Sequence, residues 1–226
     1  MLFNEVKSLD KAIQGFVDIS DEIKKRMDVA IRIVIIDDGS QDGSSKSADR
    51  LAQELDIVRV VHHSQNMGLG EVYRTGFKEA AGDYVTFYPA DGQFEPTLLF
   101  EYLPRMDDAD LVLGYLEDHR VGLLGQCLSL VERFAYNVLF GHFPKFQGIM
   151  MFRRDMLDEI TILSRGRGWG NVMELILRAH RQGYRVVHVP IRIRPRLHGK
   201  SKVNNWRSIR ANLGQLIELR LKLRKK

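Results

Sequence analysis

A carboxylate and an amide two positions apart, Asp91 and Gln93, could together bind a hard cation. The five residues before Pro89 are β-branched or aromatic and predict a buried strand, which the proline and Gly92 end. In open α/β sheets, ligands bind at the carboxyl ends of the strands, where this turn would lie. Mg2+ accepts such oxygen ligands and leaves its other positions to water and phosphates. The alternative is an Asx turn that satisfies only its own backbone.

Two further polar, glycine-rich turns each follow a predicted strand. The turn from Asp37 to Ser44 comes after the apolar run Ile31–Ile36, and the turn from His63 to Gly70 comes after Ile57–Val61. Three such turns at one edge of a parallel sheet would form a cradle for a nucleotide and a metal ion. The chain contains neither the phosphate-binding P-loop pattern nor the dinucleotide-binding glycine fingerprint.

A basic loop near the end of the chain could bind phosphate groups. Between Arg194 and Lys202 lie two arginines, two lysines and a histidine around a glycine and a serine. Arginine and lysine bind diphosphates through charge-assisted hydrogen bonds. A solvated basic loop with no ligand is the alternative.

The elements that would position these turns follow from the apolar periodicity. We expect helices over 6–26, 46–55, 69–81, from 96 onward, 123–140 and 171–182, and strands over 31–36, 57–61, 84–88, 111–116, 148–152 and 185–193. The repeated alternation of strand and helix predicts an α/β fold with a mostly parallel sheet flanked by helices. Gly76 inside a predicted helix indicates close packing on the sheet or the approach of a ligand.

Length and charge limit the class of protein. The 226 residues suffice for one large α/β domain, and a net charge of +5 favours an anionic partner. Such a partner is nucleotide phosphate, nucleic acid or an acidic lipid surface. Nucleic acid is disfavoured, because the aromatic residues are not interleaved with the basic ones. The single cysteine, Cys127, excludes an internal disulfide, and we expect neither a signal peptide nor a membrane-spanning segment.

Two segments could contact a membrane surface instead of spanning it. Residues 123–140 are apolar on more than one helical face, which indicates burial in the core or a groove for an apolar substrate. Residues 204–226 combine an apolar face with a basic end, which suits either an anionic membrane surface or docking on the protein. We therefore divide the chain into a domain over 1–203 and a basic amphipathic helix over 204–226.

Four motifs occur in order along the chain: Asp37-Asp38-Gly39-Ser40-x-Asp42-Gly43, Asn66-x-Gly68-Leu69-Gly70, Ala90-Asp91-Gly92-Gln93-Phe94-x-Pro96 and His198-Gly199-x-Ser201-Lys202. With these motifs the chain resembles the family 2 glycosyltransferases, and more narrowly the dolichyl- and polyprenyl-phosphate mannosyl- and glucosyltransferases. The resemblance implies a GT-A (Rossmann-like) fold, a donor of the GDP-mannose or UDP-glucose type, and Mg2+ or Mn2+. It also implies inverting transfer of a hexose to a polyprenyl phosphate at the cytoplasmic face of a membrane.

The resemblance assigns roles to individual residues. Asp37 and Asp38 would contact the base and ribose of the donor, and Asp91 and Gln93 would hold the metal. Glu174 would be a catalytic base or would hold the acceptor loop or the sugar, since a phosphate acceptor needs no strong base. The remaining donor-binding candidates are Asn4, Glu5, Ser40, Asn66, Gly68, Ala90, Arg196 and Lys202. The candidates for the acceptor phosphate are Arg120, His198 and Ser201.

The chain departs from the family pattern at several places. Met1 stands where the family has the proline of Pro-x-x-Asn-Glu, and the central strand before that motif is absent. We expect either a chain whose first strand is missing or a sheet that closes without it. Pro89 replaces the first carboxylate of the Asp-x-Asp pattern, and Arg120 lies four residues beyond the usual position of an acceptor arginine. Two alternatives stay open: transfer to a saccharide hydroxyl with Glu174 as the base, and a non-catalytic nucleotide-binding relative.

Overall fold

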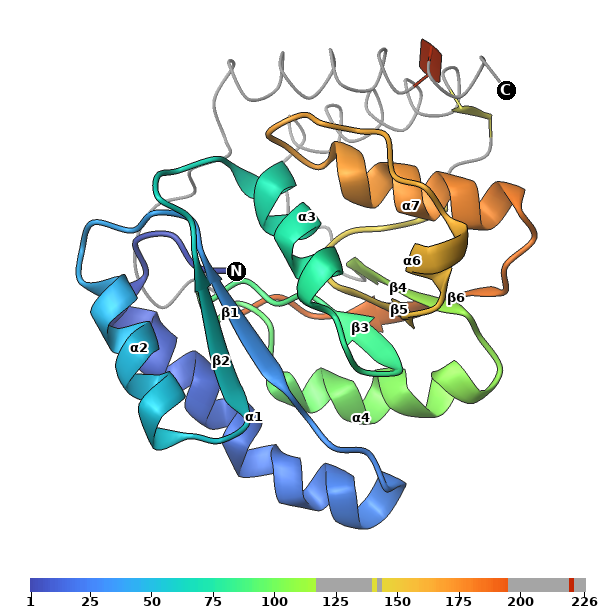
Figure 1. The fold of residues 1–226 in the computed structure, drawn as a ribbon. Helices are drawn as coiled ribbons and strands as arrows, with labels where there is room; N and C mark the ends of the chain where they lie inside the picture. The colour runs from blue at the N-terminus through green and yellow to red at the C-terminus, as the bar shows by residue number, and fades with distance from the viewer. Residues whose placement is uncertain (117–139, 142–143, 195–219, 222–226) are drawn as a thin grey trace, which may run out of the picture.

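The computed structural model describes residues 1–116, 140–141, 144–194 and 220–221, which form helices on both sides of β-strands (Figure 1). The first part contains α1 (Val6–Met27), β1 (Ile33–Asp37), α2 (Ser44–Glu54), β2 (Val58–His62), α3 (Leu69–Glu79) and β3 (Tyr84–Thr86). It continues through η1 (Pro96–Leu98), α4 (Leu99–Tyr102), η2 (Leu103–Asp107) and β4 (Leu111–Leu116). The last part contains β5 (Met150–Arg153), α6 (Met156–Glu159), α7 (Gly170–Arg181) and β6 (Val186–Ile191).

Side chains that alternate along β4 pack against helices on the two faces of its sheet. Leu111 and Leu113 are fully buried in an apolar cluster with residues of α3 and α7, whereas Val112 is buried in a second cluster with residues of α1 and α4. Successive side chains of a strand point to opposite faces, so one strand serves both helical layers. A third apolar cluster joins α1 and α2 to β1 and β2.

The strands form a mostly parallel arrangement, as the sequence predicts. β1 pairs with β2 in parallel, and β4 pairs with β6 in parallel. β5 lies between β3 and β4 and is antiparallel to both. The apolar run that predicts β5 carries no information about direction, so this reversal is not visible in the sequence.

The described strands form two separate sheets. One sheet has the order β1-β2 and the other the order β3-β5-β4-β6. Met1 and Leu2 lie between them at the carboxyl end: Leu2 N–H donates to Ile36 O at 2.9 Å, and Ala90 N–H donates to Met1 O at 3.0 Å. The described strands therefore do not close into one sheet. β1 and β3 are not paired with each other.

Most predicted boundaries agree with the structure to within a few residues. β4 spans the predicted residues, while β3 is shorter than predicted and ends at Thr86. The helix predicted from Pro96 is divided into short α and 3-10 segments, because Pro104 has no N–H group for a continuous helix. At Gly76 a Cβ atom would lie 2.3 Å from Cε1 of Phe87, so close packing explains this glycine.

Two predicted regions lie almost entirely outside the described residues. The first is the predicted apolar helix, of which only residue 140 is described. The second is the predicted basic tail, of which only residues 220–221 are described, and the boundary between 203 and 204 lies outside the described residues as well. In the part of the chain that the structure describes, no helix combines the length and the apolar character that crossing a bilayer requires.

Candidate functional site

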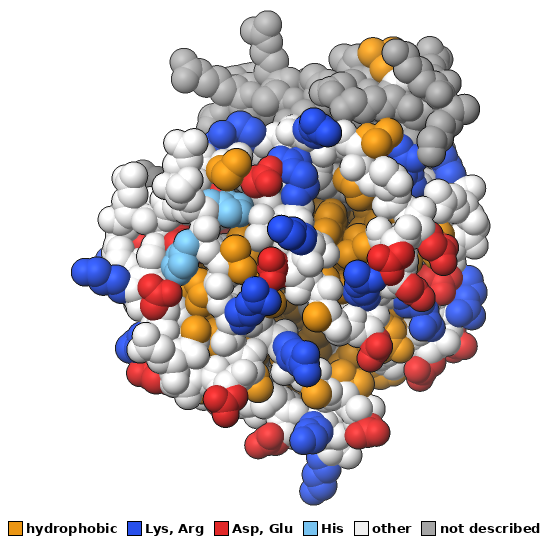
Figure 2. All heavy atoms as spheres, in the orientation of Figure 1, with side chains coloured by type: hydrophobic (Ala, Val, Ile, Leu, Met, Phe, Trp, Pro, Cys, Tyr) orange, Lys and Arg blue, Asp and Glu red, His pale blue; other side chains and the backbone are white. Residues whose placement is uncertain are grey.

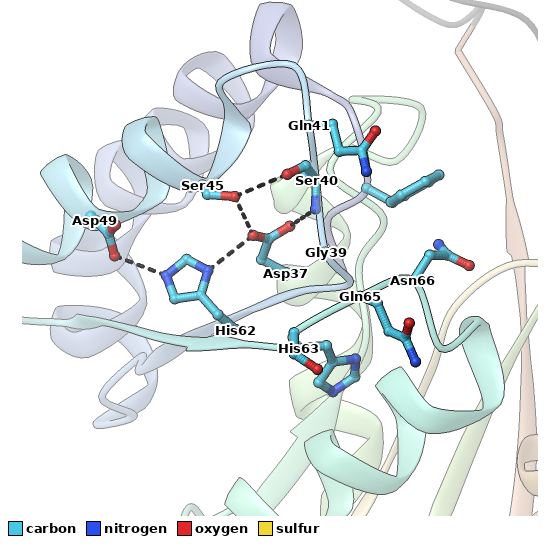
Figure 3. Close-up of a pocket in the computed structure, with 12 residues that line it drawn as sticks. Asp37, Gly39, Ser40, Gln41, Ser45, Asp49, His62, His63, Gln65 and Asn66 are labelled. Atoms are coloured by element: carbon cyan, nitrogen blue, oxygen red, sulfur yellow. Dashed lines mark hydrogen bonds and ion pairs between the residues drawn. The ribbon is translucent and has the colours of Figure 1, made fainter.

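A polar hollow of about 500 Å³ opens at the carboxyl ends of β1 and β2 (Figure 3). It is lined by Phe3, by Asp37 and Gly39–Gln41, by Ser45 and Asp49 of α2, and by His62–Asn66. Two of the three predicted turns therefore form one cavity, as parallel strands with adjacent ends require.

Asp37 organises the first turn. Its carboxylate is 1% exposed and accepts hydrogen bonds from Ser40 N–H at 3.1 Å and from the Ser45 hydroxyl at 2.6 Å. His62 Nδ1 lies 2.9 Å from the same carboxylate. Burial alone would raise the pKa of Asp37, but these hydrogen bonds outweigh it and lower the pKa below its usual value. Asp37 is thus an anion held rigidly at the cavity.

Asp38 organises the second turn. Its two oxygens accept hydrogen bonds from the Asn66 side-chain amide and from the backbone N–H groups of Met67 and Gly68, each at 2.9 Å. His63 Nδ1 lies 2.8 Å from Asp38 Oδ1. The carboxylate is only 3% exposed, so Asp38 stabilises the shape of the turn from Asn66 to Gly68.

His62 joins the β-strand ends to α2. Its two ring nitrogens lie 2.9 Å from carboxylate oxygens of Asp37 and Asp49 (Figure 3). Burial by itself would lower the pKa of His62, but the hydrogen bonds and charges of Asp49 and Asp37 raise it above 6.5. The imidazole therefore favours the cationic form between two anions.

The start of the chain is fastened to the first turn. Asn4 N–H donates to Ser40 Oγ at 2.9 Å, and the side-chain oxygen of Asn4 accepts from Gln41 N–H at 2.8 Å. Glu5 N–H donates to Ser44 Oγ at 2.9 Å. Three predicted donor-binding residues, Asn4, Glu5 and Ser40, therefore lie together.

Asp91, Gly92 and Gln93 form the predicted turn, and its hydrogen bond is the one that the alternative Asx-turn reading expects. Gln93 N–H donates to Asp91 Oδ1 at 3.1 Å, and Gly92 between them has a φ angle of 71°, which glycine adopts without strain. The donor set is one carboxylate and one amide, both hard oxygen ligands that suit Mg2+ or Mn2+. No group of three or more His, Cys, Asp or Glu that could hold a metal occurs among the described residues. The residues fit a metal whose remaining ligands come from water and a bound phosphate.

Met1 and Leu2 connect this turn to the cavity. Asp38 N–H donates to Leu2 O at 2.9 Å, on the side of β1, and Ala90 N–H donates to Met1 O on the side of Asp91. Two consecutive residues therefore separate the end of β1 from the start of the metal-binding candidate turn. The three predicted turns, which follow β1, β2 and β3, therefore lie next to one another.

The basic loop begins beside the same turn. Arg194 N–H donates to Gln93 O at 3.0 Å, and the Gln93 side-chain amide lies 3.4 Å from Arg194 O. Five candidate residues lie outside the described residues, so their placement stays a prediction: Arg120, Arg196, His198, Ser201 and Lys202.

Glu174 lies inside the protein, on α7, and is 0% exposed. Its Oε2 accepts hydrogen bonds from the backbone N–H groups of Leu163 and Ser164 at 3.0 and 2.7 Å. Its Oε1 accepts from Arg178 at 2.8 Å. Both oxygens are therefore engaged by groups of the protein.

Sequence reasoning did not assign several residues of the site. Phe3 provides an aromatic ring to the cavity, and Asp49 reaches it from α2. Phe3 precedes Asn4 directly, and its position in the chain is the only signal that could have identified it. Asp49 lies on a helical face whose contact with His62 depends on how α2 packs on β2.

Comparison with known proteins gives concordant matches. The model of the family described as Glycosyl transferase family 2 matches residues 2–161. An undecaprenyl-phosphate mannosyltransferase from Micrococcus luteus is 27% identical over 94% of this chain and 96% of its own length. A polyprenol monophosphomannose synthase from Mycolicibacterium smegmatis is 31% identical over 77% of this chain and 71% of its own length.

Solved structures agree with the fold. Mannosyltransferase PcManGT from Pyrobaculum calidifontis, in complex with GDP-Man and Mn2+, matches with a TM-score of 0.67 at 16% identity, covering 100% of this chain and 62% of that one. Glucosyl-3-phosphoglycerate synthase from Mycobacterium tuberculosis, in complex with Mn2+, UDP and phosphoglyceric acid, matches with a TM-score of 0.67 at 17% identity, covering 95% and 76%. At these identities the likeness extends to the fold alone.

Proposed function

Because this chain belongs to glycosyl transferase family 2, we propose that it transfers a hexose from a nucleotide sugar to a polyprenyl phosphate. The observation that carries the proposal is the joining of three strand-end turns across Met1 and Leu2. This arrangement brings the cavity, at the carboxyl ends of β1 and β2, next to the Asp91–Gln93 turn that follows β3. The names of the two curated relatives support the acceptor.

The donor would lie across this edge. Its base and ribose would lie in the cavity that Phe3 and the Asp37 carboxylate line. Asp91 and Gln93 would hold Mg2+ or Mn2+, which neutralises charge on the diphosphate as the sugar leaves. A donor of the GDP-mannose or UDP-glucose type suits this division of roles.

The acceptor would need orientation more than activation. A phosphate monoester carries an anionic oxygen near neutral pH, so no side chain has to remove a proton. The catalytic contribution of the protein is then placement of the two substrates and stabilisation of the leaving diphosphate by cations. Arg196 and Lys202 would supply cations to the donor, and Arg120, His198 and Ser201 would contact the acceptor phosphate. Direct attack by this oxygen on the anomeric carbon would invert the configuration.

The experiment is a transfer assay on the purified full chain. GDP-mannose or UDP-glucose, Mn2+ and a short polyprenyl phosphate should yield a lipid-linked sugar of inverted anomeric configuration, read by mass spectrometry and NMR. The matched control is the corresponding polyprenol without phosphate, which should accept no sugar. Equal transfer to polyprenol, or transfer only to a saccharide hydroxyl, would contradict the phosphate acceptor. Failure to bind either GDP or UDP with Mn2+ would indicate a non-catalytic protein.

A further inference from the structure

The segment between α6 and α7, residues 161–169, crosses the beginning of α3 (Figure 1). We call these residues the strap. Gly70 N–H donates to Arg167 O at 2.9 Å, and the side-chain amide of Asn171, at the start of α7, donates to Gly70 O at 2.7 Å. A Cβ atom at position 70 would lie 1.9 Å from Gly166 O, so the strap contacts the α3 backbone directly.

Arg167 connects the strap to the wall of the cavity. Its Nη2 donates to the backbone oxygen of Asn66 at 2.9 Å and to the side-chain oxygen of Asn66 at 2.8 Å. The other end of that amide donates to Asp38, so its orientation is fixed from both sides. Asn66 itself lines the cavity. The position of the strap therefore affects the position of this wall.

Glu174 fixes the strap from the interior. A fully buried carboxylate is unfavourable unless hydrogen-bonding donors surround it. Here the donors are Arg178 and two consecutive N–H groups of the strap, those of Leu163 and Ser164. The strap backbone thus supplies two of these three hydrogen bonds to the buried anion, and loss of the anion would release the strap.

We propose that Glu174 is a positioning residue that acts through the strap and Arg167 on the Asn66 wall of the nucleotide cavity. That the ligand is a nucleotide rests on the proposed function. The link from Glu174 through the strap and Arg167 to Asn66 rests on the hydrogen bonds alone. Removing the Glu174 charge loosens the strap, and Arg167 then no longer orients Asn66. The predicted consequence is weaker donor binding, with the chemical step itself largely preserved.

The test compares Glu174→Gln with Arg167→Ala. Calorimetry with GDP and UDP plus Mn2+ should show a Kd raised by about 5- to 50-fold in both variants, as expected for coupling between linked sites. The KM for the nucleotide sugar should rise in parallel, and kcat should change little. A general base at position 174 predicts the opposite result: a kcat lower by about 10²–10⁴-fold with donor affinity unchanged. That pattern would overturn the inference.

Three controls make the result specific. Arg165→Ala removes the same charge from an exposed neighbour on the strap and should leave nucleotide affinity unchanged. The double variant Glu174→Gln/Arg167→Ala should bind nucleotide no more weakly than the weaker-binding single variant, because both substitutions act through the same chain of contacts. Hydrogen exchange in residues 66–70 should accelerate in Glu174→Gln without any ligand.

The outcomes separate the two proposals. If the wild-type protein binds neither nucleotide, the proposed function fails, and hydrogen exchange alone decides whether Glu174 holds the strap. If the wild-type protein binds a nucleotide and Arg167→Ala binds it equally well, the inference is wrong while the proposed function stands. Arg167 is exposed, so this variant tests the connection even if replacing Glu174 prevents folding.

Discussion

Asp91 supplies the one carboxylate of the metal-binding candidate pair, so its charge should decide how the metal contributes. Asp91→Asn keeps an oxygen that can accept from Gln93 N–H but removes the anion. We expect Mn2+ to lose most of its effect on nucleotide affinity, and kcat/KM to fall by about 100-fold, a loss typical of removing one electrostatic contact to a developing charge. Calorimetry with and without Mn2+ measures the first effect, and the transfer assay measures the second.

A second carboxylate at position 93 should have the opposite effect on metal binding. With a single carboxylate, the wild-type protein should bind Mn2+ weakly until a nucleotide adds its phosphate oxygens. Gln93→Glu adds a second carboxylate and should raise Mn2+ affinity in the absence of nucleotide. A wild-type Mn2+ affinity that is equal with and without nucleotide would contradict this division of the ligands.

His62 should make stability depend on pH in the neutral range. Its pKa is raised above the unfolded value of 6.5, so its contribution is fully present below about pH 6.5 and is lost as the pH rises through the folded pKa. The side chain is 38% exposed, so after solvent screening we expect an effect of only about 1–2 °C in Tm. The difference in Tm between wild type and His62→Gln should therefore be larger at pH 6 than at pH 9.

The comparison with His62→Gln is needed because another group titrates in the same range with the opposite sign. Burial lowers the pKa of the Met1 amine from 8.0 to about 6, so this group destabilises the fold below pH 8, and stability rises as the pH increases toward 8. Both proteins contain this amine, so its effect cancels in their difference. Asp49→Asn provides a further check: it should reduce the pH dependence of Tm in the wild-type background and have no such effect when combined with His62→Gln.

The sequence identifies the residues of the site better than it identifies what each of them contacts. Asp37 and Asp38 are predicted to contact the donor. Asp37 lines the cavity, whereas Asp38 is not among the lining residues and instead accepts hydrogen bonds from the turn Asn66–Gly68. Their oxygens, however, are largely engaged by groups that lie up to 30 residues away, such as His62 and the backbone of Gly68. These partners depend on the pairing of β1 with β2, which no local pattern specifies. Only the type and place of each carboxylate could be read from the sequence.

At the scale of elements, the central feature is the separation between β1 and β3. Among the described residues, β1 pairs only with β2 and with Leu2, and β3 pairs only with β5. Unpaired strand edges leave backbone N–H and C=O groups without ladder partners, which is unfavourable. The amine of Met1 donates to Tyr88 O at 2.9 Å, two residues beyond the end of β3.

A short strand joined to Met1 should therefore stabilise the protein. Fusing five β-branched residues in front of Met1 would pair with both edges and would replace the buried amine by an amide. Each new hydrogen bond contributes about 0.5–1.5 kcal/mol, so several of them should raise Tm by about 5 °C or more. Thermal unfolding measures the shift, and amide exchange in β1 and β3 should slow.

The control for this extension is a Gly/Ser segment of the same length. It also replaces the amine but has little tendency to form a strand, so it should give a much smaller shift. Equal Tm values for the two extensions would show that the position between β1 and β3 does not accept a strand.

The elements themselves are largely readable from the sequence because their apolar patterns are strong. β4 is predicted to the residue, since a short continuous apolar run between polar segments is typical of a strand buried on both faces. The direction of β5 and the short helix α6 (Met156–Glu159) are not predicted. A run of four residues carries too little periodicity to distinguish a helical turn from a loop, and none to fix strand direction.

At the scale of the whole molecule, the distribution of charge bears on membrane attachment. The chain carries a net charge of +5. Figure 2 shows basic and acidic side chains interspersed over this face of the described residues, without a patch of one sign. The densest run of cations in the sequence is at the end of the chain, where five of the last seven residues are Lys or Arg. We therefore propose that attraction to an anionic membrane surface comes mainly from this tail.

Replacing the five tail cations by glutamine should lower binding to anionic vesicles by up to about 10³-fold, because each basic residue near such a surface contributes about 1 kcal/mol. Co-sedimentation with phosphatidylglycerol-containing vesicles measures the loss, and wild-type binding should weaken as salt rises, since a Debye length of about 10 Å at 0.1 M shrinks to about 3 Å at 1 M. Vesicles of phosphatidylcholine alone should bind both proteins weakly. The matched control removes five exposed lysines elsewhere, Lys11, Lys24, Lys25, Lys46 and Lys78. If that control weakens binding as much as the tail variant does, attraction follows net charge, and the tail has no special role.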